Sequence, residues 1–140
     1  MKPLKRSVAL VIETPGGLLL VRRPDDDESL PGEWGLPAAT LRAGETEEGA
    51  VRRAGRDKLG VEVSPLHPLG EAEDERPGYR IVMRDWAVEI TSGVPSVPQP
   101  GGETQYDDWR WGEAAELAPA ARHGSLCARV LLRERGIAPG

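Results

Sequence analysis

The pattern of apolar and polar positions predicts strands in the first third of the chain. Residues 5–14 are apolar with several β-branched side chains, residues 15–17 read Pro-Gly-Gly, and residues 18–23 are apolar again. β-Branched runs favour strands, whereas Pro and Gly favour turns. The pattern therefore predicts a strand, a turn and a second strand, followed by an acidic surface loop over residues 24–32 and a short strand-like run over residues 34–41.

Residues 46–59 are predicted to form the main helix of the first half of the chain. Thr46 is a suitable N-cap residue, and the two glutamates that follow it carry the negative charge that stabilises a helix N-terminus. Gly60 suits the left-handed position after the last turn. Two glycines inside the segment each cost about 1 kcal/mol relative to alanine, so packing must hold this helix in place.

The second half of the chain alternates between extended segments and loops and closes with a helix. Its predicted elements are an irregular or edge strand over residues 61–69, a charged loop over 71–77, a long strand over 79–91, a Pro/Gly-rich loop over 92–102, a last strand over 104–111, a helical turn over 113–117 and a helix over 125–135. Strands on both sides of one helix, with a second helix at the end, predict an α/β sandwich.

Length and charge restrict the class of protein. The 140 residues suit one domain, and 18 basic against 23 acidic residues give a net charge of −5. Duplex nucleic acids and membrane surfaces attract basic faces, so neither is an expected partner. Cys127 has no second cysteine for an internal disulfide, which favours a reducing, cytoplasmic location. The apolar run over residues 8–12 is too short to span a membrane.

Residues 34–61, WGLPAATLRAGETEEGAVRRAGRDKLGV, resemble the signature of the Nudix hydrolase family. That signature is a Gly, five residues, a Glu, seven residues, Arg-Glu, an aliphatic, any residue, Glu-Glu, any residue, Gly and an aliphatic. Glu45 and Arg53 stand at the first Glu and at the Arg, and Gly60 and Val61 close the motif. The resemblance extends over nearly the whole chain. It implies one Nudix domain over residues 1–140, folded as an α/β/α sandwich with a mixed sheet, a motif helix and a C-terminal helix.

The metal-binding half of the signature departs from the family pattern. Ala54 stands where the first metal-binding Glu belongs, and Asp57 and Lys58 occupy the paired-Glu positions. In the family these carboxylates hold divalent metals that bridge a diphosphate and activate water. Spacings of three and four residues place the three positions on one helix face. Exchanging three Glu for Ala, Asp and Lys shifts the local charge by +3, and an ammonium group repels a divalent cation.

The resemblance implies a role for each residue of the motif, beside a simpler interpretation. Asp57 is the remaining candidate for metal ligand and catalytic acid, or the partner of Arg53 in an ion pair four residues apart. Lys58 is a candidate to contact a phosphate in place of the metal, or a solvated lysine at the helix end. Glu45 and Arg53 form a salt bridge that fixes the loop to the helix. Glu103 is the candidate base or further ligand, or an exposed loop acid.

Aromatic and arginine side chains on the predicted strands are the candidates for substrate binding. Trp86 and Trp109 are expected to stack on a nucleobase, as the family's late strands do, and Tyr79, Tyr106 and Trp111 belong to the same group. Arg22 and Arg84, with Arg23 and Arg80, suit bidentate contact with phosphate. The simpler interpretation places the aromatic residues in the core or at its rim and the arginines on the surface.

Two functions therefore remain open. The first is a hydrolase of a nucleoside diphosphate linked to another moiety, weak or unusual in activity, with Mg²⁺ or Mn²⁺ as cofactor. The second is a catalytically inactive module that binds a small-molecule nucleotide or diphosphate and needs no cofactor. Dimers are common in the family, so a homodimer is one candidate assembly, although no residue of this sequence specifies it. A pure protein-interaction surface is a third interpretation. Dependence on a divalent metal separates the first function from the second.

Overall fold

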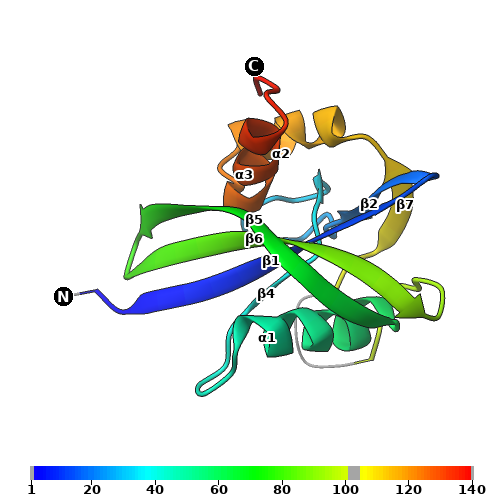
Figure 1. The fold of residues 1–140 in the computed structure, drawn as a ribbon. Helices are drawn as coiled ribbons and strands as arrows, with labels where there is room; N and C mark the ends of the chain where they lie inside the picture. Colours follow the sequence, from blue (N-terminus) through cyan, green and yellow to red (C-terminus); the bar gives the residue numbers. More distant parts are fainter. Residues whose placement is uncertain (1, 101–104, 140) are drawn as a thin grey trace.

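A mixed β-sheet with helices on both faces organises the chain (Figure 1). The computed structural model describes residues 2–100 and 105–139. Within these ranges the strand order is β3-β2-β1-β6-β5, with β4 beside β1 and β7 beside β2. The bounds are β1 Leu4–Thr14, β2 Gly17–Arg22, β3 Trp34–Gly35, β4 Ala38–Thr40, β5 Glu62–Arg76, β6 Tyr79–Ser92 and β7 Asp108–Gly112. The predicted sandwich is confirmed.

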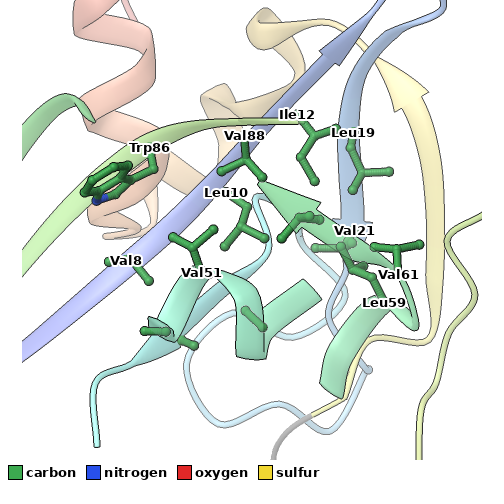
Figure 2. Packing of buried hydrophobic residues seen from close by; sticks show 14 of the residues in the cluster. Val8, Leu10, Ile12, Leu19, Val21, Val51, Leu59, Val61, Trp86 and Val88 are labelled. Atoms are coloured by element: carbon green, nitrogen blue, oxygen red, sulfur yellow. The ribbon is translucent and has the colours of Figure 1, made fainter. Parts of the chain in front are cut away.

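The middle of the central strand β1, residues 8–12, is buried on both faces of the sheet, which explains its unbroken apolar sequence. Val8, Leu10 and Ile12 face the cluster beneath helix α1 (Glu47–Ala54), whereas Ala9 and Val11 face the cluster beneath α3 (Leu126–Glu134). β1 runs parallel to β6 and antiparallel to β2 and β4. Figure 2 shows side chains of β1 packed against Val51 and Leu59 of the motif helix and its last turn.

The predicted helix over residues 46–59 is confirmed, with a change of geometry in its last turn. The Thr46 hydroxyl accepts a hydrogen bond from the Gly49 N–H at 3.0 Å, as an N-cap does. Helix α1 passes into a π-helical turn, η1 (Gly55–Leu59), and Gly60 follows with φ of 69°. A Cβ at Gly55 would lie 2.9 Å from the Val63 side chain. Glycine at this position therefore allows the turn to lie against β5.

The prediction of a charged loop over residues 71–77 is wrong, because residues 71–76 belong to strand β5. Glu71 and Glu75 lie across from Arg84 and Arg80 of β6, and the Arg84 guanidinium contacts the Glu71 carboxylate at 2.6 Å. The chain reverses only at Pro77 and Gly78, where Gly78 has φ of 85°. Opposite charges on paired strands attract, so a charged run forms an exposed edge strand here.

The remaining elements differ from expectation mainly at their ends. Residues 34–41 split into β3 and β4, and the last strand begins only at Asp108. The expected turn over residues 113–117 is the 3-10 helix η2 (Ala114–Leu117), and a short helix that was not predicted, α2 (Ala118–Arg122), follows it. The Pro/Gly-rich loop is confirmed as far as residue 100, and its last two residues lie outside the described ranges. No helix in the described part of the chain is long and apolar enough to cross a membrane.

Candidate functional site

A cleft formed by two joined compartments lies beside β4 and the start of β6. The motif compartment has a volume of about 420 Å³ and the α3 compartment about 380 Å³. Both are lined by Arg23, Ser29, Ala38, Tyr79, Ile81 and Met83. The motif compartment adds Ser7, Ala39, Thr40, Lys58 and Tyr106. The α3 compartment adds Leu30, Arg76, Pro77, His123, Gly124, Ser125, Leu126 and Cys127.

Lys58 is held in the wall of the motif compartment by contacts on two sides. Its side chain is buried, and the ammonium Nζ donates a hydrogen bond to the Ala38 carbonyl oxygen at 2.6 Å. Nζ also lies 5.5 Å from the centre of the Tyr106 ring. The Tyr106 hydroxyl accepts a hydrogen bond from the Ala38 N–H at 3.0 Å. Burial raises the pKa of Tyr106 to about 12, so this phenol stays neutral beside the lysine.

The two compartments are lined by cationic groups, two of which are paired with carboxylates outside the lining. Arg23, Lys58 and Arg76 supply these groups, and Arg23 lies 3.4 Å from Asp27 and Arg76 lies 2.9 Å from Asp74. An adjoining pocket that also contains Arg23 and Ser29 is lined by the acids Asp26, Asp27 and Glu28. The described lining of the motif compartment contains Arg23 and Lys58 and no carboxylate, which suits an anion. The apolar wall of Tyr79, Ile81 and Met83 is suited to a flat organic group.

The residues at the family's metal positions do not fit a divalent metal. Mg²⁺ and Mn²⁺ require several oxygen ligands. Ala54 has no ligand atom and packs in the core at 1% exposure, and Lys58 brings a positive charge. Asp57 is the one carboxylate of the three, and its residue is exposed. Within the described part of the chain, no three His, Cys, Asp or Glu residues gather in a way that could hold a metal ion.

The expected salt bridge between Glu45 and Arg53 is present and nearly buried. Arg53 Nε donates to Glu45 Oε2 at 2.8 Å and Arg53 Nη2 donates to Oε1 at 2.9 Å, so the contact is bidentate. Nη2 also donates to the Thr40 carbonyl oxygen at 2.8 Å. The Arg53 guanidinium, helped by the Arg42 N–H, lowers the pKa of Glu45 to about 2. These bonds fix the approach loop, and with it β4, against the motif helix.

The structure does not test whether the two expected catalytic acids, Asp57 and Glu103, lie together. The Asp57 carbonyl oxygen accepts a hydrogen bond from Gln105 Nε2 at 3.3 Å, which ties the turn η1 to the chain that precedes β7. The ion pairs between described residues do not include the expected contact of Asp57 with Arg53. Glu103 lies outside the described residues. The catalytic role of both acids stays a prediction.

Four expected substrate-binding residues are absent from the described lining of the cleft. Arg22 bonds Asp25 and Asp107, and Arg84 pairs with Glu71 and Glu47. Trp86 is buried under α1 and donates its indole N–H to Glu47 at 2.8 Å. Trp109 makes an edge contact with Trp111 at 5.6 Å between ring centres. The fifth expected substrate-binding residue, Lys58, does belong to the described lining of the cleft.

Sequence reasoning missed the apolar wall of the cleft. Tyr79, Ile81 and Met83 alternate along β6 and therefore share one face of the sheet. This alternation is visible in the sequence, and Tyr79 and Arg23 belong to the wider groups of aromatic and arginine candidates for substrate binding. The sequence does not show that this face meets β4 and the N-terminal turn of α3, because both contacts join residues far apart in the chain.

Comparisons with known proteins agree on one family. The model of the NUDIX domain matches residues 3–131. A protein of Enterobacter sp. (strain 638), "Nucleoside triphosphatase NudI", is 34% identical over 49% of this chain and 50% of its own length. A Mycobacterium tuberculosis protein, "Putative 8-oxo-dGTP diphosphatase 2", is 34% identical over 73% of this chain and 69% of its own. The chain therefore spans about half the length of the first of these relatives.

Solved structures share the fold. A NUDIX hydrolase from Nitrosomonas europaea superimposes with a TM-score of 0.74 at 21% identity. The superposition covers 96% of this chain and 89% of the chain of that hydrolase. The MutT protein from Methanosarcina mazei Go1 gives a TM-score of 0.72 at 18% identity, over 96% of this chain and 95% of its own. At these identities the likeness concerns the arrangement of strands and helices.

Proposed function

Because the chain belongs to the Nudix family, we propose that it binds a nucleoside diphosphate derivative in the cleft without a divalent metal. The observation that supports this function is the lining of the motif compartment. A buried lysine stands where the family has a metal-binding carboxylate, and the described lining contains no carboxylate. A fixed ammonium group supplies to a phosphate the positive charge that a metal ion would otherwise supply.

The two compartments suggest how such a ligand is oriented. Its phosphates occupy the motif compartment, close to Lys58 and Arg23 and to the hydroxyl groups of Ser7 and Thr40. The Ser7 and Thr40 hydroxyl groups form a hydrogen bond with each other at 3.1 Å between their oxygens, so one proton of this pair is left to donate to a phosphate. Charged donors to phosphate form shorter and stronger hydrogen bonds than neutral donors do. The base then lies along Tyr79, Ile81 and Met83 toward the α3 compartment.

Replacing Lys58 by methionine tests this function. We expect wild-type protein to bind ADP in the presence of EDTA, and Lys58→Met to bind about 10–100-fold more weakly, since a charge-assisted hydrogen bond contributes about 1.5–3 kcal/mol. Isothermal titration calorimetry measures both affinities. Arg56→Met is the matched control, because Arg56 is an exposed cation of the same turn whose partner is Glu62 at 3.7 Å.

Two results would contradict the proposal. Binding of ADP that appears only after Mg²⁺ or Mn²⁺ is added would show that the ligand needs a metal. Equal affinity in Lys58→Met and in the wild type would show that Lys58 does not contact the phosphates. Arg56→Met is expected to bind as the wild type does, and circular dichroism of each variant confirms that it is folded.

Weak hydrolysis of a nucleoside diphosphate linked to another moiety is the second candidate, favoured by the names of the relatives. One relative is a nucleoside triphosphatase by name, and another carries the name of an 8-oxo-dGTP diphosphatase. This activity would require Asp57 together with a carboxylate from outside the described residues, for which Glu103 is the candidate. Metal-dependent turnover that is lost in both Asp57→Ala and Glu103→Gln would establish it.

The partner expected under either function is a small molecule. The net charge of −5 disfavours duplex nucleic acid and anionic membrane surfaces, which attract basic faces. The cationic cleft is local and does not alter this overall balance. A homodimer and a cytoplasmic location stay predictions, and sedimentation equilibrium would determine the oligomeric state.

A further inference from the structure

A buried carboxyl group without a hydrogen-bond partner lies between the sheet and α3. Asp85 is in the middle of β6, and its exposure is 0%. Neither carboxyl oxygen has a hydrogen-bond partner in the described structure. An unsatisfied buried polar group costs about 1–3 kcal/mol, and an unpaired buried charge costs more. Such a residue in a packed core calls for an explanation other than stability.

The surroundings of Asp85 are apolar on the sheet side and partly charged on the helix side. Its strand partners are Ala9 of β1 and Gly70 of β5. A Cβ at Gly70 would lie 3.3 Å from both Val130 and Glu134 of α3, so this helix packs directly over the neighbouring strand. The titratable or charged groups near Asp85 are Arg133, Glu134 and Cys127 of α3 and Glu71 of β5.

Arg133 does not neutralise Asp85 in this arrangement. Its Nη2 donates to the Glu71 carbonyl oxygen at 2.7 Å, at the exposed side of the helix. Burial raises the pKa of Asp85 to about 8, and the positive charge of Arg133 offsets this rise only in part. The carboxyl group is therefore protonated at neutral pH while α3 is packed, whereas an aspartate in water has a pKa of about 3.9.

We propose that a single proton on the Asp85 carboxyl group controls the packing of α3 against the sheet, and that the helix separates from the sheet more readily when this proton is lost. When α3 opens, Asp85 meets water, ionises and releases its proton to the solvent. A rise in pH therefore favours the open state, because the open state binds fewer protons than the packed state. Repacking of the helix takes the proton back.

The first turn of α3 connects this equilibrium to the cleft. Ser125, Leu126 and Cys127 line the α3 compartment, and Met83 lies two residues before Asp85 on the same face of β6. Opening of α3 removes that wall. A ligand that fills the α3 compartment is then expected to lower the opening equilibrium of α3, because it binds the packed state and not the open one. This last step rests on the proposed function, whereas the opening of α3 does not.

Hydrogen exchange of the backbone amides of α3 tests the proposal on the protein without ligand. After correction for intrinsic exchange, we expect the opening equilibrium of wild-type α3 to rise about tenfold per pH unit between pH 5 and 7.5 and to level off above pH 8. In Asp85→Asn, which has no proton to lose, the opening equilibrium should be independent of pH. Asp26→Asn is the matched control, because it removes an exposed carboxylate and should keep the wild-type pH dependence.

Each result of the hydrogen-exchange experiment either supports or overturns the proposal. Equal pH dependence in wild type and Asp85→Asn, or no pH dependence in the wild type, would overturn the proposal. If Asp85→Asn does not fold, the carboxyl ¹³C resonance of Asp85 in the wild type serves instead. A titration midpoint near pH 4 in the folded protein would overturn the proposal, and a midpoint near pH 8 would support it. Failure of ADP binding alone, with the α3 result intact, would contradict the proposed function and leave the control of α3 standing.

Discussion

Replacing Asp85 by asparagine is expected to raise the free energy of unfolding by about 4 kcal/mol at pH 7. In the wild type the pKa of Asp85 is about 8 when folded and buried, against about 3.9 in the unfolded chain. The proton on Asp85 contributes fully to the free energy of unfolding below pH 4. This contribution falls by about 1.4 kcal/mol per pH unit as the pH rises from 4 to 8. Asparagine has the same size and cannot ionise, so it avoids this loss.

Urea denaturation at pH 5, 6, 7 and 8 measures this effect. The gain from Asp85→Asn should be about 1.5 kcal/mol at pH 5 and should grow with each pH unit up to pH 8. Asp57→Asn serves as control, because its carboxylate is exposed and the substitution should leave the pH dependence of the wild type unchanged. A gain that is the same at every pH, or a loss of stability that grows with pH, would contradict the expected protonation of Asp85.

Replacing Arg53 by alanine is expected to lower the free energy of unfolding by about 3–5 kcal/mol, as the loss of one partner of a buried ion pair does. The guanidinium group bonds both oxygens of Glu45 and the Thr40 carbonyl oxygen, and the side chains of Arg53 and Glu45 are only 7% and 17% exposed. Its removal leaves a nearly buried carboxylate and a carbonyl group without this donor. Chemical denaturation at pH 7 measures the loss.

Arg56→Ala is the control for this substitution, because Arg56 lies on the same helical segment, is half exposed and has one distant partner. Its effect should stay within about 0.5 kcal/mol. The stability of the wild type at acid pH is a second measurement of the same salt bridge. The pKa of Glu45 is about 2, so the stability from the pair is present above pH 4.5 and is lost as the pH falls toward 2. A loss in Arg53→Ala no larger than in Arg56→Ala would show that the salt bridge does not hold the loop.

Local signals in the sequence were enough to predict most of the elements. The apolar run of β1 is continuous because the strand is buried on both faces, and such a run is visible without knowledge of its partners. Thr46 and Gly60 determine the ends of the motif helix through contacts within five residues. The spacing between Glu45 and Arg53 likewise allowed their salt bridge to be predicted from the resemblance alone.

Features that depend on distant contacts could not be predicted in this way. An acidic run such as residues 71–77 has the composition of a loop, and only pairing with Arg80 and Arg84 makes it a strand. The burial of Asp85 depends on α3 covering that face of β6. The alternation along β6 separates Arg84 and Trp86 from Tyr79 and Met83, but the cleft combines β4, β6 and the start of α3, so the sequence alone did not show which of the two faces lines it.

Product release in the presence and absence of metals tests the proposed metal-free binding most directly. Folded wild-type protein would be incubated with nucleoside triphosphates and with nucleoside diphosphate derivatives such as ADP-ribose, with Mg²⁺, with Mn²⁺ and with EDTA, beside Asp57→Ala. We predict no metal-dependent turnover of any substrate by either protein, while ADP binds in EDTA. Metal-dependent turnover by the wild type that disappears in Asp57→Ala would contradict this and establish a working metal site at the motif helix.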